Sequence, residues 1–122
     1  MNTVLVVDDE LIRRDEFNRR LTGSILDFAD NPLDAIKLIR SKVYDFIFLD
    51  HDLGDAVLDG RDVCTCFYMS KNIHASVIVH SINPAGGDAM VHILSNLGVP
   101  VGRIPFSHPK FWALVSEEMG RL

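Results

Sequence analysis

Short apolar runs alternate along this chain with longer stretches in which apolar residues recur at helical spacing. The runs favour strands, and turn or capping residues bound the helical stretches. A strand followed by a helix, repeated along a chain, is typical of a parallel sheet with helices on both faces. We therefore predict one α/β domain over residues 1–122, with a five-stranded, doubly wound parallel sheet. The predicted strands are 3–7, 24–29, 46–50, 76–80 and 101–106.

The predicted helices are recognised by their end signals and by their apolar faces. The first covers roughly 10–22 and stops before Gly23, and the last begins at Pro109. Pro32 begins the second, and Gly60 precedes the third. Residues at helical spacing should face the sheet. In chain order they are Leu11, Ile12, Phe17 and Leu21; Ala35, Ile36, Ile39 and Val43; Val63, Cys64, Phe67 and Tyr68; Met90, Ile93, Leu94 and Leu97; and Phe111, Leu114, Val115 and Met119.

The composition fits a single globular domain. The chain has 122 residues, of which 48% are hydrophobic, and this is enough to bury a core. A net charge of −5 argues against bulk binding to nucleic-acid backbones. Without a spanning apolar stretch or a basic signal sequence, we expect a soluble, cytoplasmic protein with no membrane partner. Cys64 and Cys66 lie two positions apart in a predicted helix, and we expect both to be reduced thiols.

Acidic residues follow two of the predicted strands. Asp8 and Asp9 come directly after the first strand, and Asp50 ends the third. If these strands are parallel neighbours, their carboxyl ends open into one crevice, where open α/β sheets bind ligands. Like charges in a small site repel one another unless a cation neutralises them, and oxygen ligands suit a hard ion such as Mg²⁺. The pattern therefore predicts metal-assisted phosphate chemistry.

The chain resembles the receiver domain of response regulators over nearly its whole length. The resemblance rests on the acidic pair, on Asp50 and on Ser81, which follows the fourth predicted strand. It implies the flavodoxin-like receiver fold with strand order 2-1-3-4-5. It also implies that Asp8, Asp9 and Asp50 hold Mg²⁺, or Mn²⁺ in its place, together with the backbone carbonyl of Asp52. In such a site Asp50 is the nucleophile that accepts a phosphoryl group, and the Ser81 hydroxyl binds a phosphoryl oxygen.

One element of the receiver pattern is missing. Receivers carry a lysine after the fifth strand, usually followed by proline, and in this chain His108-Pro109 stands in its place. Arg103 and Lys110 are the nearest other cations. Because imidazole loses its charge near neutral pH, the usual phosphate clamp is absent or has been replaced.

Two segments resemble a divergent receiver branch named for cyclic-phosphate processing, namely DHDLG at 50–54 and HSINPAG at 80–86. This resemblance implies metal-dependent attack on a cyclic phosphodiester, at an RNA end or on a nucleotide. His51, His80 and His108 are then candidate general acids or bases. Each also has a structural alternative: a loop residue, a strand-end residue bonded to a carbonyl, and a helix cap, respectively. A transition-metal site of His51, Asp52 and His80 is a minor alternative.

The basic residues of the first predicted helix alternate with acidic ones. We interpret them as a solvated face with internal ion pairs, in preference to a docking patch for a kinase. They are Arg13, Arg14, Arg19 and Arg20, interleaved with Asp15 and Glu16.

Three functions remain open. The first is a stand-alone receiver in two-component signalling, in which Asp50 becomes a phosphoaspartate in a phosphorelay with a histidine kinase or phosphotransfer protein. The second is an enzyme that opens a cyclic phosphate with the same carboxylates and metal. The third is a degenerate docking module without metal. We favour the first, because the resemblance to receivers in general is broader than that to the branch. We expect a monomer or a weak homodimer.

Overall fold

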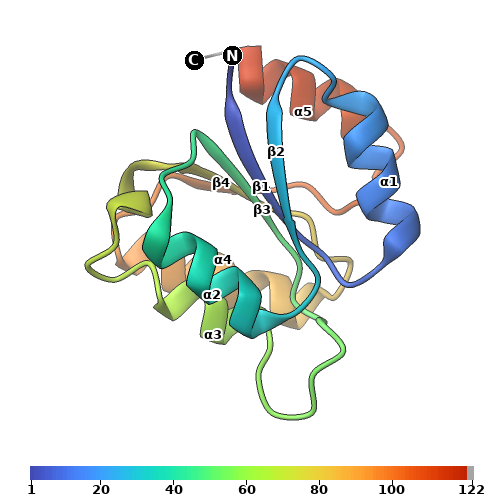
Figure 1. The fold of residues 1–122 in the computed structure, drawn as a ribbon. Helices are drawn as coiled ribbons and strands as arrows, with labels where there is room; N and C mark the ends of the chain where they lie inside the picture. Colours follow the sequence, from blue (N-terminus) through green and yellow to red (C-terminus); the bar gives the residue numbers. More distant parts are fainter. Residues whose placement is uncertain (121–122) are drawn as a thin grey trace.

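The structure is a computed structural model that describes residues 1–120. Within these residues, strands and helices alternate as predicted (Figure 1). The strands are β1 (Thr3–Val7), β2 (Ile25–Ala29), β3 (Phe46–Leu49), β4 (Ser76–Val79) and β5 (Val101–Arg103). The helices are α1 (Leu11–Arg20), α2 (Pro32–Ser41), α3 (Gly60–Thr65), α4 (Pro84–Asn96) and α5 (Phe111–Gly120), with a short 3₁₀ helix, η1 (Lys71–His74), before β4.

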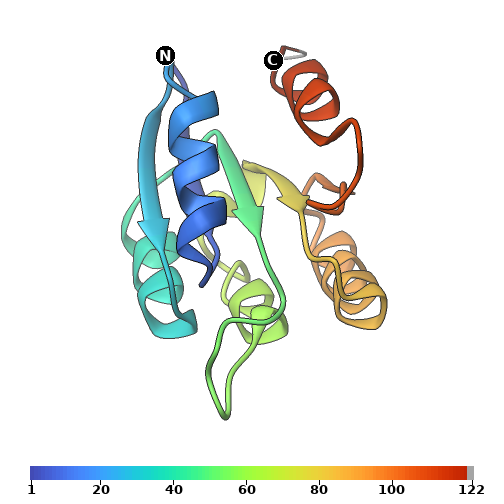
Figure 2. The same cartoon turned by 90° about the vertical axis from the view of Figure 1, so that its right-hand side faces the viewer.

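All five strands are parallel and lie in the order β2-β1-β3-β4-β5, which confirms the predicted doubly wound sheet (Figure 2). From β1 the chain continues toward one edge of the sheet, and from β3 toward the other. Val7 and Leu49 are register partners, so Asp8 and Asp50, which follow them, begin side by side. Open α/β sheets bind ligands at such a switch point, outside the carboxyl ends of the strands.

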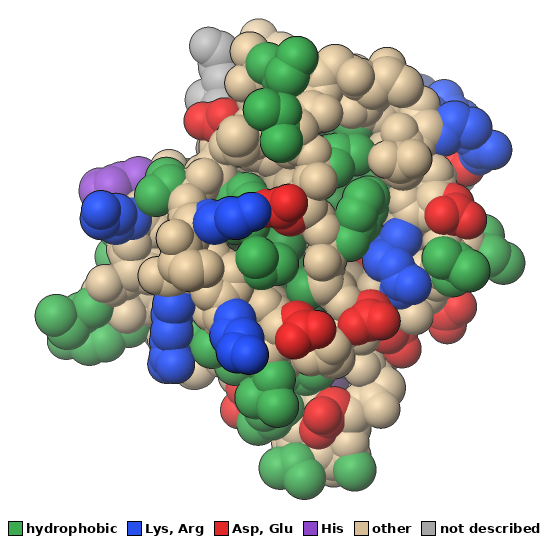
Figure 3. Space-filling view, viewed as in Figure 1, with side chains coloured by type: hydrophobic (Ala, Val, Ile, Leu, Met, Phe, Trp, Pro, Cys, Tyr) green, Lys and Arg blue, Asp and Glu red, His purple; other side chains and the backbone are tan. Residues whose placement is uncertain are grey.

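The outer surface mixes charges of both signs. On the face drawn in Figure 3, acidic and basic side chains are interspersed, and neither sign forms a continuous patch there. None of the described helices combines the length and the apolar composition that crossing a membrane requires.

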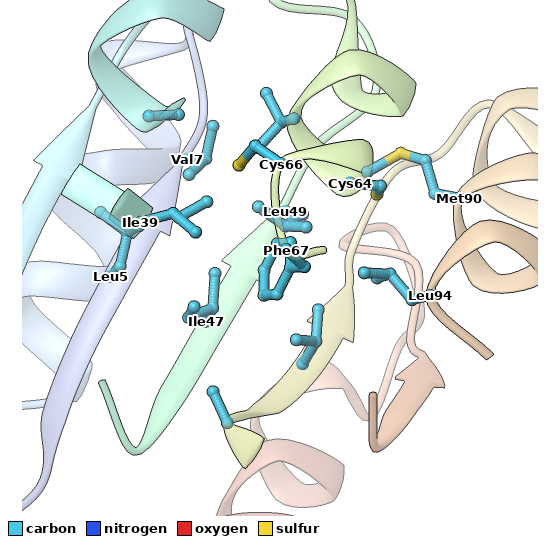
Figure 4. Packing of buried hydrophobic residues seen from close by; sticks show 14 of the residues in the cluster. Leu5, Val7, Ile39, Ile47, Leu49, Cys64, Cys66, Phe67, Met90 and Leu94 are labelled. Carbon is cyan, nitrogen blue, oxygen red and sulfur yellow. The ribbon is translucent and has the colours of Figure 1, made fainter. Parts of the chain in front are cut away.

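Two hydrophobic layers cover the sheet, one on each face. Side chains alternate between the faces along a strand, so Leu5 and Val7 of β1 belong to one layer, and Val4 and Val6 to the other. The first layer packs against α2, α3 and α4, and Figure 4 shows part of it. The second layer packs against α1, through Phe17, and against α5. The helix α1 therefore lies on the same side of the sheet as the even-numbered side chains of β1.

Several residues predicted to face the sheet are exposed instead. Leu11 and Ile12 are 62% and 82% exposed, because only residues three or four positions from Phe17 share its buried face of α1. Tyr68 is exposed because α3 already ends at Thr65. Val43 is exposed because it follows the end of α2.

The predicted fifth strand is also too long. It ends at Arg103, and the chain then reaches Pro105, which has no backbone N–H to donate. The neighbouring amides still pair with β4, since Ile104 donates to the Val79 carbonyl and Phe106 to the His80 carbonyl.

Both cysteines are buried free thiols, as predicted. Burial raises the pKa of Cys66 to about 11 and also raises that of Cys64. Both side chains belong to the first hydrophobic layer, and they remain protonated near neutral pH.

Candidate functional site

Three polar side chains meet at the carboxyl edge of the sheet, because the backbone ladder continues one residue past the strands. The Asp50 amide donates to the Val7 carbonyl, and the His80 amide to the Leu49 carbonyl, each at 3.0 Å. The alternation of side chains continues as well, and it places Asp8, Asp50 and His80 on the α1 side of the sheet. One ligand atom from each of these three residues lies within 4.8 Å of the others.

Asp8 is fully buried, and both of its carboxylate oxygens are hydrogen-bonded. Arg13 donates from Nε to Oδ2 at 2.8 Å and from Nη2 to Oδ1 at 2.9 Å. His80 Nε2 lies 2.8 Å from Oδ2, and the Glu10 amide donates to Oδ1 at 2.9 Å. Burial by itself raises the pKa of Asp8, but the hydrogen bonds from His80 and Arg13 outweigh burial and lower the pKa to about 2. Asp8 is therefore an ionised anchor for two other side chains.

Asp50 is buried but less completely bonded. The His51 amide donates to Oδ1 at 2.8 Å, and Arg13 Nη2 donates to Oδ2 at 3.1 Å. Burial raises the pKa of Asp50; the negative charge of Asp8 adds to this effect, and the positive charge of Arg13 opposes it. A carboxylate whose pKa is raised is more basic, as a nucleophile or metal ligand in an active site requires.

Gly60, the first residue of α3, lies against the backbone that carries Asp50. Its amide donates to the His51 carbonyl at 2.8 Å, and a Cβ added here would lie 2.4 Å from the Asp50 carbonyl oxygen. We predict that Gly60→Ala lowers the free energy of unfolding by about 1–3 kcal/mol, because backbone atoms must shift to make room. Urea denaturation measures this loss. Gly23→Ala is the control, since nothing lies within 4 Å of a Cβ there; equal losses would contradict the crowding.

Arg13, which we predicted to lie on a solvated face, points into the site instead. Its side chain is 23% exposed, and beyond Asp8 its Nη2 atom lies 3.1 Å from Asp50 and 3.8 Å from Asp9. The overlooked signal is spacing: Arg13 lies four residues before the buried Phe17, so the two share one face of α1. One guanidinium therefore joins three carboxylates.

The other arginines of α1 lie outside the acidic cluster. Arg19 and Arg20 form ion pairs with Glu16, as the solvated-face interpretation predicted. Arg14 donates to the Asp8 backbone carbonyl at 2.8 Å and so helps to hold the start of the helix.

A pocket of about 190 Å³ opens beside the cluster. Asp9 lies on its wall with its carboxylate near Gly54 of the β3–α3 loop. Burial raises the pKa of Asp9, and the negative charge of Asp8 adds to this effect. The lining of the pocket combines acidic side chains with the apolar Ile82 and Phe106. The pocket is lined by Asp9, Glu10, Arg13, Asp50, Asp52, His80, Ile82 and Phe106.

His80 is buried in an aromatic setting. Its ring centroid lies 5.4 Å from that of Phe17, and 6.4 Å from those of Phe48 and Phe106. Because Asp8 is ionised and can only accept, we assign the shared proton to His80 Nε2. Nδ1 is buried, and it has no hydrogen-bond partner among the described residues. The structural alternative of a histidine bonded to a carbonyl is thus replaced by a carboxylate–histidine pair.

The ring of His51 lies away from the acidic pocket. Nδ1 is 2.8 Å from Asp52 Oδ1, and Nε2 is 3.5 Å from Asp59 Oδ2. The ring packs on Gly86 of α4, where a Cβ would lie 2.4 Å from it, and lines a second cavity of about 220 Å³. His51 and His80 therefore face different cavities, which does not support the minor hypothesis of a shared transition-metal site.

The Ser81 hydroxyl accepts a hydrogen bond within the loop that follows β4. Ser81 is buried, and its Oγ accepts the Asn83 amide at 3.1 Å. Strand alternation places Ser81 on the opposite face from His80. Arg103 holds the same loop, donating from Nη2 to the carbonyls of Ser81 at 3.0 Å and Asn83 at 3.4 Å, and it passes so close to Gly87 that a Cβ there would lie 2.3 Å from Nε.

The comparison with protein families decides between receiver branches. A sequence model described as the cyclic-phosphate processing receiver domain matches residues 3–96, from β1 through α4. The chain belongs to this family. No protein in the curated collection is significantly similar to it.

Solved receiver domains share the fold. The receiver domain of the sensor histidine kinase PA1611 from Pseudomonas aeruginosa, determined with magnesium in its active-site cleft, has a TM-score of 0.77 at 19% identity and covers 98% of this chain and 95% of its own. TrrA from Thermotoga maritima, in complex with Mg²⁺ and BeF, has a TM-score of 0.75 at 24% identity, covering 99% and 98%. The non-phosphorylated HemR receiver from Leptospira biflexa gives 0.76 at 18%, covering 98% and 93%. At these identities the likeness shows the fold alone.

In this receiver domain the residue directly after β5 is Ile104, followed by Pro105. We had predicted that His108-Pro109 takes the place of the lysine and proline. Instead His108 is exposed, and its Nδ1 accepts the Lys110 amide at 3.0 Å in the turn just before α5. Ile104 packs against the second hydrophobic layer, so the place of the lysine is apolar.

The receiver pocket offers oxygen ligands for a divalent ion. Asp9 and Asp50 line it with carboxylates, which Mg²⁺ prefers, and Asp52 lies at its exposed rim. Asp8 was predicted as a third ligand, but two protein donors occupy each of its oxygens, whereas each oxygen of Asp50 has one. The residues present therefore fit Mg²⁺ best at Asp9 and Asp50.

Proposed function

We propose that the acidic pocket opens cyclic phosphate esters by metal-dependent hydrolysis. The observation that carries the proposal is His80, which lines the pocket beside Asp50 and whose buried Nδ1 has no hydrogen-bond partner among the described residues. Breaking an ester bond calls for a group that accepts and returns a proton near neutral pH, and imidazole is suited to this. A site that only accepts a phosphoryl group has less need of one. The description of the family supports the same substrate class.

The reaction adds one water across a phosphorus–oxygen bond of the ring. The water oxygen bonds to phosphorus, one ring oxygen leaves as an alkoxide, and the product is a phosphate monoester. His80 accepts the proton of the water at Nδ1 and returns it to the leaving oxygen, while Asp8 holds the imidazole through Nε2. Mg²⁺ held by Asp9 and Asp50 would neutralise charge on the phosphate oxygens.

Asp50 supports a second candidate function, reversible phosphorylation. It directly follows β3, the central strand of the sheet, and its pKa is raised by burial. The donor would be a histidine kinase or a phosphotransfer protein. Two features disfavour the standard receiver switch: the Ser81 hydroxyl is bonded within its own loop, and the apolar Ile104 occupies the place of the lysine.

Phosphorus NMR separates the two functions. The protein is incubated with Mg²⁺ and, in separate samples, a 2′,3′-cyclic nucleotide, a 3′,5′-cyclic nucleotide and acetyl phosphate. We expect a ring-opened monoester from a cyclic substrate, and a rate at least about 10²-fold lower in His80→Gln, as loss of a general acid–base requires. His92→Gln is the matched control, because His92 is exposed on α4 and contacts Asn96.

Other outcomes assign the pocket differently. Acetyl phosphate that labels wild type but not Asp50→Asn, with no cyclic substrate consumed, would identify a phosphoacceptor. Turnover that survives His80→Gln would contradict the role of His80.

A further inference from the structure

We propose that Arg13 is the residue that binds the phosphate group in the acidic pocket, in the role that the missing lysine leaves open. This inference rests on the proposed function only in requiring that a phosphate compound enters the pocket. It names a residue of α1 that the receiver pattern does not predict, and not a residue after β5.

The charges of the pocket show why such a residue is needed. Asp9, Asp50 and Asp52 line the pocket in which an anionic phosphate would lie, and like charges in a confined site repel it. Arg13 is the one permanently charged cation among the residues that line this pocket.

Other cationic side chains near the strand ends contact other groups or lie outside the pocket. Arg103 donates to the carbonyls of Ser81 and Asn83 and lies within 3.8 Å of Asp88. Arg14 donates to the Asp8 backbone carbonyl. Lys110 is exposed at the start of α5 and lies outside the lining of the pocket.

The donor geometry of Arg13 leaves two N–H groups for a ligand. A guanidinium has five N–H donors in a fixed plane. Nε donates to Asp8, and Nη2 donates to Asp8 and Asp50, which uses three of them. Nη1 has no hydrogen-bond partner among residues 1–120. Since the side chain lines the pocket and is partly exposed, Nη1 is available to phosphate oxygens.

Asp8 also orients the guanidinium before a ligand arrives. The two parallel hydrogen bonds between Arg13 and Asp8, at 2.8 and 2.9 Å, hold the guanidinium plane in place. A donor held in position loses little freedom on binding an anion, so it binds more tightly than a flexible one. The buried Asp8 thereby serves as a support for a phosphate-binding arginine.

Binding of inorganic phosphate tests this assignment directly. Isothermal titration calorimetry with phosphate, at a fixed saturating Mg²⁺ concentration, compares wild type with Arg13→Gln, Arg13→Lys and Arg19→Gln. We expect Arg13→Gln to weaken phosphate binding about tenfold or more, as loss of a charge-assisted hydrogen bond implies. Arg13→Lys should bind with intermediate affinity, because it keeps the charge but loses the paired donors.

The controls separate phosphate binding from stability. Arg19→Gln removes the same charge from the same helix at an exposed ion pair and should bind phosphate like wild type. In Arg13→Ala, millimolar guanidinium ion should restore part of the phosphate affinity, which a structural defect would not allow. If the neutral variants do not fold, nitrogen-15 NMR of the wild-type arginine side chains replaces them, and phosphate should shift the Arg13 resonances first.

Each result decides the assignment. Phosphate affinity unchanged in Arg13→Gln, or no phosphate binding to wild type, overturns the inference. Phosphate binding that depends on Arg13 without any cyclic-phosphate turnover upholds it and contradicts the proposed function. If Arg13→Gln turns over a cyclic phosphate with an unchanged KM, the proposed hydrolysis is upheld and the inference about Arg13 is overturned. Arg13 is then only a counter-ion of Asp8.

Discussion

Replacing Asp8 with alanine is expected to lower the free energy of unfolding by about 3–5 kcal/mol, measured by urea denaturation at neutral pH. Asp8 is fully buried and is the counter-charge of Arg13 and the hydrogen-bond partner of His80. Without it the guanidinium is left in a site that lacks its main partner, and a poorly paired buried charge costs far more than a lost surface ion pair.

The same carboxylate should make stability depend on pH. The pKa of Asp8 is about 2 in the folded protein, below its ordinary value of 3.8. A carboxylate whose pKa falls on folding stabilises the folded state above its unfolded pKa, and this stabilisation is lost as the pH falls through the folded pKa. Between about pH 4 and pH 2, wild type should lose on the order of 2 kcal/mol by this route, and Asp8→Asn should not.

Asp9→Asn is the matched control for this pH dependence. The pKa of Asp9 is raised, so its contribution has the opposite sign and becomes less unfavourable as the pH falls. Asp9→Asn should still lose stability between about pH 4 and pH 2, because Asp8 is protonated there as in wild type. If Asp9→Asn abolishes that loss, its assignment to Asp8 is wrong.

Mg²⁺ is expected to stabilise wild type by about 2.7 kcal/mol when its concentration is 100 times its dissociation constant. The reason is linkage: an ion that binds the folded carboxylates and not the unfolded chain shifts the equilibrium toward the folded state. Thermal unfolding with and without Mg²⁺ measures the shift. Asp50→Asn and Asp9→Asn should each remove most of it, because these two side chains offer carboxylate oxygens to the pocket.

Asp50→Asn should also change stability in the absence of metal. Because burial raises the pKa of Asp50, its ionised form disfavours folding at neutral pH, and the neutral amide should make the metal-free protein more stable.

Asp52→Asn is the control for the Mg²⁺ effect, since its side chain is 67% exposed and the receiver pattern uses only its backbone carbonyl. An equal loss of the Mg²⁺ effect in Asp52→Asn would place the ion at the rim of the pocket.

The fold followed from local patterns. Apolar runs alternate with helical periods, and that alternation is enough to predict a parallel sheet with helices on both faces. Once β1 and β3 are neighbours, backbone pairing brings Asp8 and Asp50 together, so the acidic site was also predictable. The errors on helix faces, such as Leu11 and Ile12, arose because apolar composition does not say which face of a helix is buried.

The partners within the site were decided by tertiary structure. His80 was a candidate from the resemblance to the cyclic-phosphate branch, but its pairing with Asp8 joins residues 72 positions apart. Strand alternation separates His80 from Ser81 and turns the Ser81 hydroxyl to the loop of Asn83. The place of the lysine could be assigned to Ile104 only once the end of β5 was known.

The sequence by itself thus determined the sheet, its acidic edge and the resemblance to receivers, because periodicity and the order of residues along strands are local properties. Only the tertiary structure decided that Arg13 joins Asp8 to Asp50 and that the His108 side chain bonds within the turn before α5. The physical reason is that an arginine side chain can serve a solvated face or a buried carboxylate equally well. Which of these it does depends on the packing of Phe17, one turn further along α1, against the sheet.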